Sequence, residues 1–176
     1  MIRFFVPGEP HGKLAGEPAV KKVGRRRVSF VRTPSKSRKY MDTVRDALTR
    51  EGGTIEGPFC LRIQAIFQPP KSALKRAGGI MWMKPDTDNI SKAILDGAVK
   101  SGQIPDDARC FCELITKRYA KAGEPEGVHV SIMSDDHETF EREFLSWCFD
   151  FLRWRAVSKG RKFIFDFVYL LGLQGE

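Results

Sequence analysis

The stretch Phe59–Phe67 reads F-C-L-R-I-Q-A-I-F, and its alternation constrains the fold more than any other feature of this sequence. Its odd-numbered positions are all apolar, whereas Arg62 and Gln64 occupy two of the positions between them. Because side chains along a strand point alternately to the two faces of a sheet, this pattern predicts a β-strand with one face in the core. Pro69-Pro70 ends the strand, since proline cannot continue the hydrogen-bonded ladder.

Weaker signals complete the secondary structure. Strand-like composition occurs at 2–6, 27–32, 110–119 and 128–133, and helical spacing of apolar residues follows Thr33-Pro34-Ser35 as far as Gly52-Gly53 and runs again from Asp88 to about Lys100. Residues 11–26 are expected to form a basic loop, and residues 71–83 a mobile, basic loop. This order predicts an α+β fold: a single small domain with a mixed or antiparallel sheet and two main helices.

Composition restricts the class of protein. At 176 residues, with 41% hydrophobic and 30% charged residues, the chain is neither wholly disordered nor low in complexity. It has no apolar run near the ~20 residues of a membrane-spanning helix and no secretory signal at Met1, so we expect a cytoplasmic protein with reduced cysteines. Cys110-x-Cys112 could form half a zinc site, but buried small hydrophobes are favoured because no second pair or nearby histidine completes it.

The positive charge is concentrated at the N-terminal end. The net charge is +8, but residues 1–50 alone hold 13 Lys/Arg against 4 Asp/Glu. Such a cluster is an electrostatic footprint for a polyanion, because each neutralised phosphate releases counterions. The alternative is a solvated surface loop, and charge alone does not distinguish DNA from RNA or an anionic membrane. The cluster comprises Lys21, Lys22, Arg25, Arg26, Arg27, Arg32, Lys36, Arg38 and Lys39.

Residues 135–176 are interpreted as a separate, mostly helical C-terminal extension of unknown role. They hold 10 of the 19 aromatic residues of the chain, a density that requires a surface to pack against. A helix from about Glu138 to Arg155 would align Phe140, Phe144, Trp147, Phe151 and Trp154 along one stripe, and 163–173 could be a second helix or a strand.

A group of acidic residues is the strongest candidate for chemistry. In Lys84-Pro85-Asp86-Thr87-Asp88-Asn89 two carboxylates lie two residues apart at a helix start, where they could bind one hard cation such as Mg²⁺. Lys92 lies one turn beyond Asp88, so its ammonium would sit beside the metal and stabilise charge on a phosphate. Taken alone, this pattern could equally be a solvated acidic turn in which Asp88 caps the helix.

Asp106-Asp107 follows the helix and could supply a third carboxylate. A 12-residue helix rises ~18 Å and an extended return covers about 20 Å, so Asp107 can reach Asp86 and Asp88 within one subunit, but only just. A site shared across a dimer is the alternative. Together with the basic N-terminal segment, these acids indicate metal-dependent phosphodiester chemistry.

The segments K-P-D-T-D-N-I-S-K-A-I-L-D-G-A and I-P-D-D-A-R closely resemble the core of the RusA family of Holliday-junction resolvases. The resemblance covers roughly residues 1–133, which we interpret as a RusA-like endonuclease domain of residues 1–134. It implies that the essential carboxylates are Asp86, Asp88 and Asp107, that the essential lysine is Lys92, and that a homodimer makes paired, symmetric, Mg²⁺-dependent nicks in four-way DNA junctions. It also implies a bacterial or prophage source. Two features depart from the pattern: Gly97, where the family usually has a larger or alanine-like residue, which is a minor change, and the C-terminal extension.

The expected function is therefore structure-selective DNA cleavage in recombination or repair, with Mn²⁺ a possible substitute for Mg²⁺ and no membrane or nucleotide cofactor. The alternatives are a non-catalytic basic DNA-binding accessory protein and, less favoured, a D-x-D metal-dependent sugar-nucleotide transferase. Phosphate contacts would give selectivity for DNA shape more than for sequence. The residues expected to bind DNA are Arg25, Arg26, Arg27, Lys36, Arg38, Lys39 and Lys84.

Overall fold

The computed structural model describes residues 1–134, 142 and 145–149. The chain divides into two compact units, Met1–Ser134 and Asp135–Glu176. In the described part of the chain, we find no helix with the length and apolarity needed to cross a bilayer.

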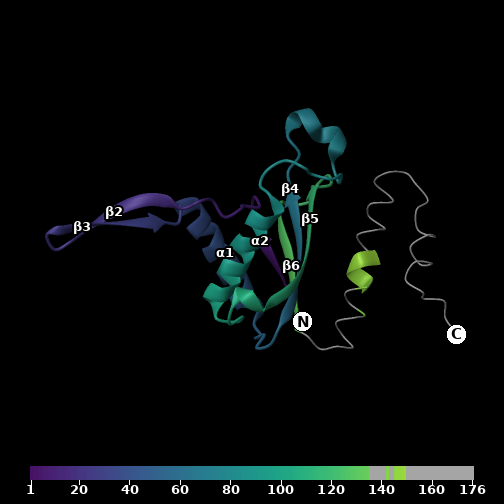
Figure 1. Cartoon of the computed structure of the whole chain (residues 1–176). Coiled ribbons are helices and arrows are strands. Elements are labelled where there is room, and N and C mark those ends of the chain that lie inside the picture. Colours follow the sequence, from purple (N-terminus) through teal and green to yellow (C-terminus); the bar gives the residue numbers. More distant parts are fainter. Residues whose placement is uncertain (135–141, 143–144, 150–176) are drawn as a thin grey trace. The chain divides into compact units, whose positions relative to one another are not determined.

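A four-stranded mixed sheet forms the centre of the first unit (Figure 1). Its strand order is β1 (Ile2–Pro7), β6 (Gly127–Ser134), β4 (Phe59–Phe67) and β5 (Cys110–Tyr119). β6 pairs antiparallel with both β1 and β4, whereas β4 and β5 are parallel. A parallel pair needs a long crossover, and here the crossover contains the helix that carries the candidate acids. The α+β fold and the alternation of Phe59–Phe67 are both confirmed, with Leu61 and Ile63 fully buried.

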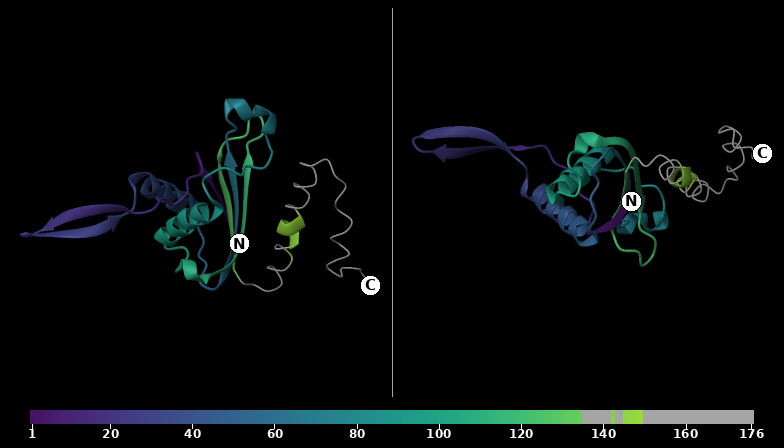
Figure 2. Two further views of the ribbon diagram at one scale, coloured as in Figure 1. Left: turned by 45° about the horizontal axis from the view of Figure 1, so that its top comes forward. Right: turned by 90° about the horizontal axis from the view of Figure 1, so that it is seen from below.

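Two helices cover one face of this sheet, as Figure 2 shows from two further directions. α1 spans Ser35–Glu51 and α2 spans Thr87–Ser101, close to the predicted bounds. Their apolar stripes pack against the sheet and against each other. The two helices approach closely at Gly97, where an added Cβ would be 2.6 Å from Cβ of Val44 in α1. This departure from the family pattern therefore has a packing role. Gly102, in the left-handed region at φ +75°, ends α2 as expected.

The basic loop predicted for residues 11–26 is wrong over most of its length. Residues Glu17–Val23 form β2, which pairs antiparallel with β3 (Arg26–Arg32) in a separate two-stranded sheet. The hairpin extends away from the main sheet (Figures 1 and 2), and nearly all of its residues are exposed. Because neither face is buried, no alternation of apolar residues reveals β2 in the sequence. Gly24, at φ +60°, allows the tight turn at the tip of the hairpin.

The loop predicted for residues 71–83 also contains regular structure. Lys71–Arg76 form a short 3₁₀ helix, η1, and a second one, η2, spans Asp107–Arg109. After η1 the chain runs beside the end of β5, where Tyr119 N donates to Gly79 O at 2.8 Å and Met81 N donates to Lys117 O at 3.2 Å. The segment that precedes the candidate acids is therefore attached to the sheet.

The prediction for the C-terminal extension falls almost entirely outside the described residues. Arg142 and residues 145–149 are helical, which agrees with the helix expected over 138–155. The remaining expected aromatic positions of that helix, and the element expected at 163–173, lie outside the described part of the chain.

Candidate acidic site and basic surface

Asp86 and Asp88 stand at the N-terminus of α2 with exposed carboxylates. Asp86 is the N-cap residue and has extended backbone angles, but its side chain makes no capping hydrogen bond. Asp88 lies in the first turn, with a side chain 62% exposed. Negative charge is favourable at this helix end, and neither carboxylate is used to cap the helix. Both side chains are therefore available to a ligand, which argues against the simple acidic-cap alternative.

Lys92 lies beside this pair, as its i+4 spacing from Asp88 predicts. Its Nζ is 3.3 Å from Oδ2 of Asp88, and its side chain is also exposed. An exposed pair of this kind adds little to stability. The ammonium group can therefore turn to another anion, such as a phosphate oxygen, without a large loss of folding free energy.

A second lysine, Lys117 of β5, supports the segment that leads to Asp86. Its Nζ donates to the backbone oxygens of Met83 and Pro85, each at 2.7 Å. Burial lowers the pKa of Lys117, and the nearby charge of Asp86 partly opposes this effect. The sequence analysis missed this residue, because its position next to α2 depends on the pairing of β4 with β5.

The base of the β2–β3 hairpin also contacts the start of α2. Lys13 N donates to Asn89 O at 2.8 Å, and Lys13 Nζ forms an ion pair with Asp96 at 2.7 Å. Gly12 lies so close that an added Cβ would be 2.9 Å from Cβ of Asn89. This glycine allows the chain leading into the hairpin to pass directly beside the acidic pair.

Asp106 and Asp107 lie at the opposite end of α2. The Ser91 hydroxyl donates to Glu113 Oε2 at 2.6 Å, and Lys117 reaches Pro85, so α2 runs antiparallel to β5. Asp107 opens η2, just before β5 and just after the C-terminal end of α2. With a rise of ~1.5 Å per residue, the helix separates Asp88 from its own C-terminal end by about 20 Å.

Of the two arrangements that the sequence leaves open, the described residues do not show the one in which a single subunit brings the three carboxylates together. Among the described residues, no group of three or more His, Cys, Asp and Glu side chains could hold a metal ion. The estimate from chain length gave only the distance that residues 101–106 could cover if they were fully extended. Residues 107–109 instead coil into η2, and β5 starts after them, near the C-terminal end of α2. The Asp106 side chain is used locally: it accepts from Ala108 N at 2.9 Å, which is the main reason why its pKa is lowered.

The donor chemistry of Asp86 and Asp88 fits part of a magnesium site. Mg²⁺ is bound in proteins by one or two carboxylates, keeping several waters and often a substrate phosphate oxygen. Two exposed carboxylates without capping partners meet that description. One chain therefore supplies an incomplete but chemically suitable set of ligands.

The cysteines do not add to this site. Cys60 is buried, Cys110 and Cys112 are half-buried, and all are free thiols. Burial is the main cause that raises the pKa of Cys110 to about 11, so its thiol stays protonated near neutral pH. Cys110 and Cys112, which the sequence analysis favoured as buried small hydrophobic residues, are only partly buried.

The basic side chains expected to bind DNA lie in three places on the surface, and all of them are exposed. Arg25, Arg26 and Arg27, which we call the tip arginines, are exposed at the turn of the hairpin. Lys36, Arg38 and Lys39 are exposed in the first turns of α1. Lys84 is exposed two residues before Asp86.

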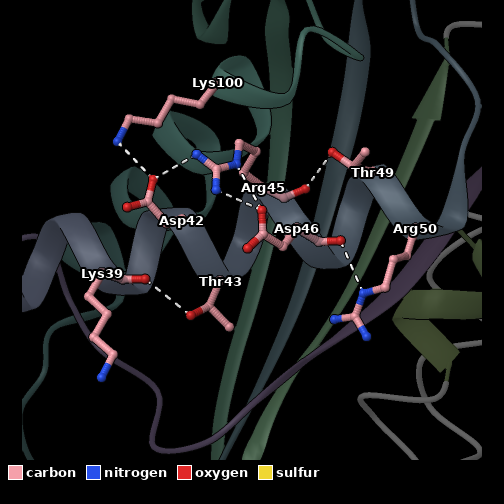
Figure 3. Close-up of polar contacts among 8 residues, drawn as sticks. All are labelled: Lys39, Asp42, Thr43, Arg45, Asp46, Thr49, Arg50 and Lys100. Atoms are coloured by element: carbon pink, nitrogen blue, oxygen red, sulfur yellow. Dashed lines mark hydrogen bonds and ion pairs between the residues drawn. The ribbon is translucent and has the colours of Figure 1, made fainter.

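Further along α1 the charges are paired with one another. Figure 3 shows Arg45 bound to Asp42 and Asp46, and Lys100 of α2 at 3.7 Å from Asp42. The Lys39 ammonium points away from these carboxylates. The N-terminal part of α1 therefore presents positive charge that these carboxylates do not neutralise, at the end of the helix that follows the hairpin in the chain.

An α+β domain with an acidic helix start, an adjacent lysine and a projecting basic hairpin has the features of a protein that acts on nucleic acid. The family model for endodeoxyribonuclease RusA matches residues 7–133. The chain belongs to this family of endodeoxyribonucleases, which confirms the family expected from the D-x-D-N and D-D segments. No curated protein matches the chain significantly.

Proposed function

We propose that this protein is a Mg²⁺-dependent endonuclease that resolves four-way DNA junctions by paired, symmetric nicks. One observation carries the proposal: within a domain of the RusA family, two exposed aspartates and Lys92 gather at the start of α2. Nuclease activity follows from the family, while the metal, the junction substrate and the paired cuts are our proposal. The domain of residues 1–134 carries this activity.

Asp86 and Asp88 of one protomer bind the metal together with Asp107 of a second protomer. The length of α2 supports this arrangement, since it keeps Asp107 far from the acidic pair of its own chain. A two-fold dimer in which η2 of each chain faces the α2 start of the other would contain two complete sites. Two symmetric sites suit a junction, where two strands of the same polarity are cut.

The reaction is hydrolysis of a backbone phosphodiester. Bound Mg²⁺ supplies a Lewis acid that polarises a phosphate oxygen and lowers the pKa of a bound water. Asp86 and Asp88 would hold the ion, and Lys92, whose Nζ lies beside Asp88, would face a phosphate bound there. The Lys92 ammonium neutralises charge that develops on the non-bridging oxygens as water adds to phosphorus and one P–O bond breaks.

The basic surface holds the DNA arms. The tip arginines, the lysines and arginine at the start of α1, and Lys84 contact phosphates, so they position the substrate without reading its sequence. Residues 12–13 contact the first turn of α2 and lead into the hairpin, so the chain segment that ends in the basic hairpin also passes beside the acidic pair.

The test uses a synthetic four-way junction and the purified full chain in Mg²⁺ or Mn²⁺. We expect nicks at symmetric positions, loss of cleavage in Asp88→Asn, and unchanged or tighter junction binding by that variant because one repulsive charge is removed. Glu51→Gln, an equal change of charge at an exposed position at the end of α1, is the matched control and should cut normally.

Two outcomes would contradict the proposal. Near-normal cleavage by Asp88→Asn would reject the acidic pair as the site. Tight junction binding without cleavage in either metal would instead identify a DNA-binding accessory protein.

A further inference from the structure

We propose that Trp82 stacks on a nucleobase exposed at the branch point, so that the segment before Asp86 recognises disrupted base stacking. This inference rests on the proposed function and deepens it by assigning a base-binding subsite beside the acidic pair. The subsite is an exposed apolar patch, which we call the Trp82 patch, formed by Leu74, Ile80, Trp82 and Met83.

The Trp82 patch is unusual for a protein surface. The side chains of Trp82, Leu74 and Met83 are 66%, 62% and 56% exposed, although they lie close together in the sequence. Single exposed apolar residues are ordinary on a surface, but four large ones within residues 74–83 are a concentration that favours a binding role. Tryptophan offers the largest flat surface for stacking of any side chain.

The segment that carries Trp82 is held in place from both sides. Its backbone hydrogen bonds to β5 direct Met81 into the core, where it is only 8% exposed, and the next side chain therefore points outward. On the far side of Trp82, the hydroxyl of Tyr119 contacts Met83 Sδ at 3.9 Å, and Lys117 holds the Met83 carbonyl. A side chain that protrudes from a fixed segment is pre-organised to bind, because little order has to be gained.

The positive charge around the Trp82 patch favours DNA, rather than an apolar protein surface, as its ligand. Residues 68–85 contain Lys71, Lys75, Arg76 and Lys84 and not one acidic residue. The guanidinium of Arg76 lies over one face of the Trp82 ring, 4.6 Å from its centre, while the side chain as a whole stays 66% exposed, so a base would stack on the face that Arg76 leaves open. An aromatic platform among basic side chains is the combination that binds single-stranded nucleic acid.

The patch lies within reach of the reacting phosphate. Asp86 is four positions after Trp82 in the chain, which limits their Cα distance to about 14 Å. At about 3.4 Å per stacked nucleotide, this is some four nucleotides from the phosphate at the acidic pair. A continuous duplex offers no free base face at that distance, whereas a branch point does, because stacking is interrupted there.

The experiment measures equilibrium binding without cleavage, in EDTA, on a four-way junction and on a linear duplex with the sequence of one arm. We expect Trp82→Ala to weaken junction binding about 5- to 150-fold, which is the effect of losing one base–aromatic stack. Duplex binding should change less than about twofold. Trp82→Phe keeps an aromatic face and should restore much of the preference, whereas Trp82→Leu, which is apolar but cannot stack, should not.

A fluorescent purine analogue placed at the branch point gives a second measurement. Its emission would not depend on residue 82 if Trp82 had only a structural role. Its emission should be quenched by the wild type and by Trp82→Phe, and not by Trp82→Ala. The inference is overturned if Trp82→Ala binds junction and duplex with the wild-type ratio, or weakens both equally. Either result can occur in a protein that still nicks junctions, so failure of this inference is distinct from failure of the proposed nuclease function.

Discussion

The separation of Asp107 from Asp86 and Asp88 leads to a prediction about mixed dimers. Two oxygens bound to one Mg²⁺ at ~2.1 Å can be at most about 4.2 Å apart, whereas α2 holds Asp88 about 20 Å from its own C-terminal end. Side-chain movement cannot close that gap. If Asp107 is a ligand, it must act on the acidic pair of the other protomer.

The perturbation is to combine Asp88→Asn chains with Asp107→Asn chains, each inactive on its own. Each heterodimer has two different sites. One site contains both substituted residues, and the other contains the unaltered Asp88 of one chain and the unaltered Asp107 of the other chain. Random exchange makes half of the dimers heterodimers, each with one intact site of two. We therefore expect about one quarter of the wild-type number of active sites, and heterodimers purified through two different tags should have about half.

The assay is nicking of a four-way junction in Mg²⁺, with products separated under native and denaturing conditions. A heterodimer with one site should nick one strand per binding event, so nicked junctions should accumulate and paired cuts should be rare. Inactive heterodimers would refute the reasoning, because a site built within one subunit is destroyed in both halves of this mixture. Full activity of Asp107→Asn alone would reject Asp107 as a ligand.

Three further predictions concern packing, DNA binding and pH. Gly97→Ala should lower the melting temperature by several degrees. Overpacking against Val44 costs about 1–3 kcal/mol, whereas the gain in helix propensity returns only about 1 kcal/mol. A higher melting temperature would contradict this close packing. Replacing all three tip arginines with alanine should reduce the slope of log affinity against log salt by up to about 2.7, and an unchanged slope would mean that they do not touch DNA. Glu124→Gln should destabilise the fold at neutral pH by at most about 3 kcal/mol, since hydrogen bonds from Arg118 at 2.6 Å are the main cause that lowers the pKa of Glu124 to about 2. That contribution is present above pH 4.5 and is lost as the pH falls toward 2, so the difference in melting temperature between variant and wild type should vanish over that range.

Where a local pattern also determines burial, the sequence predicted the structure well. β4 was predicted with its observed bounds because Phe59–Phe67 has one face in the core and therefore alternates. The two main helices were found from their apolar spacing and from Gly102. The same approach missed β2, because a hairpin that is exposed on both faces is held by its backbone hydrogen bonds, and these leave no periodic signal.

The sequence by itself placed Asp86 and Asp88 at one helix start and determined that Lys92 lies beside Asp88, since residues four apart share a helix face whatever surrounds them. Only the tertiary structure decided where Asp107, Lys117 and residues 12–13 lie relative to that pair. The first is kept away by the antiparallel packing of α2 on β5, and the others are brought close by strand pairing and by the path of the chain past α2. Contacts between distant segments depend on the direction in which whole elements pack, and chain length only limits how far they can reach.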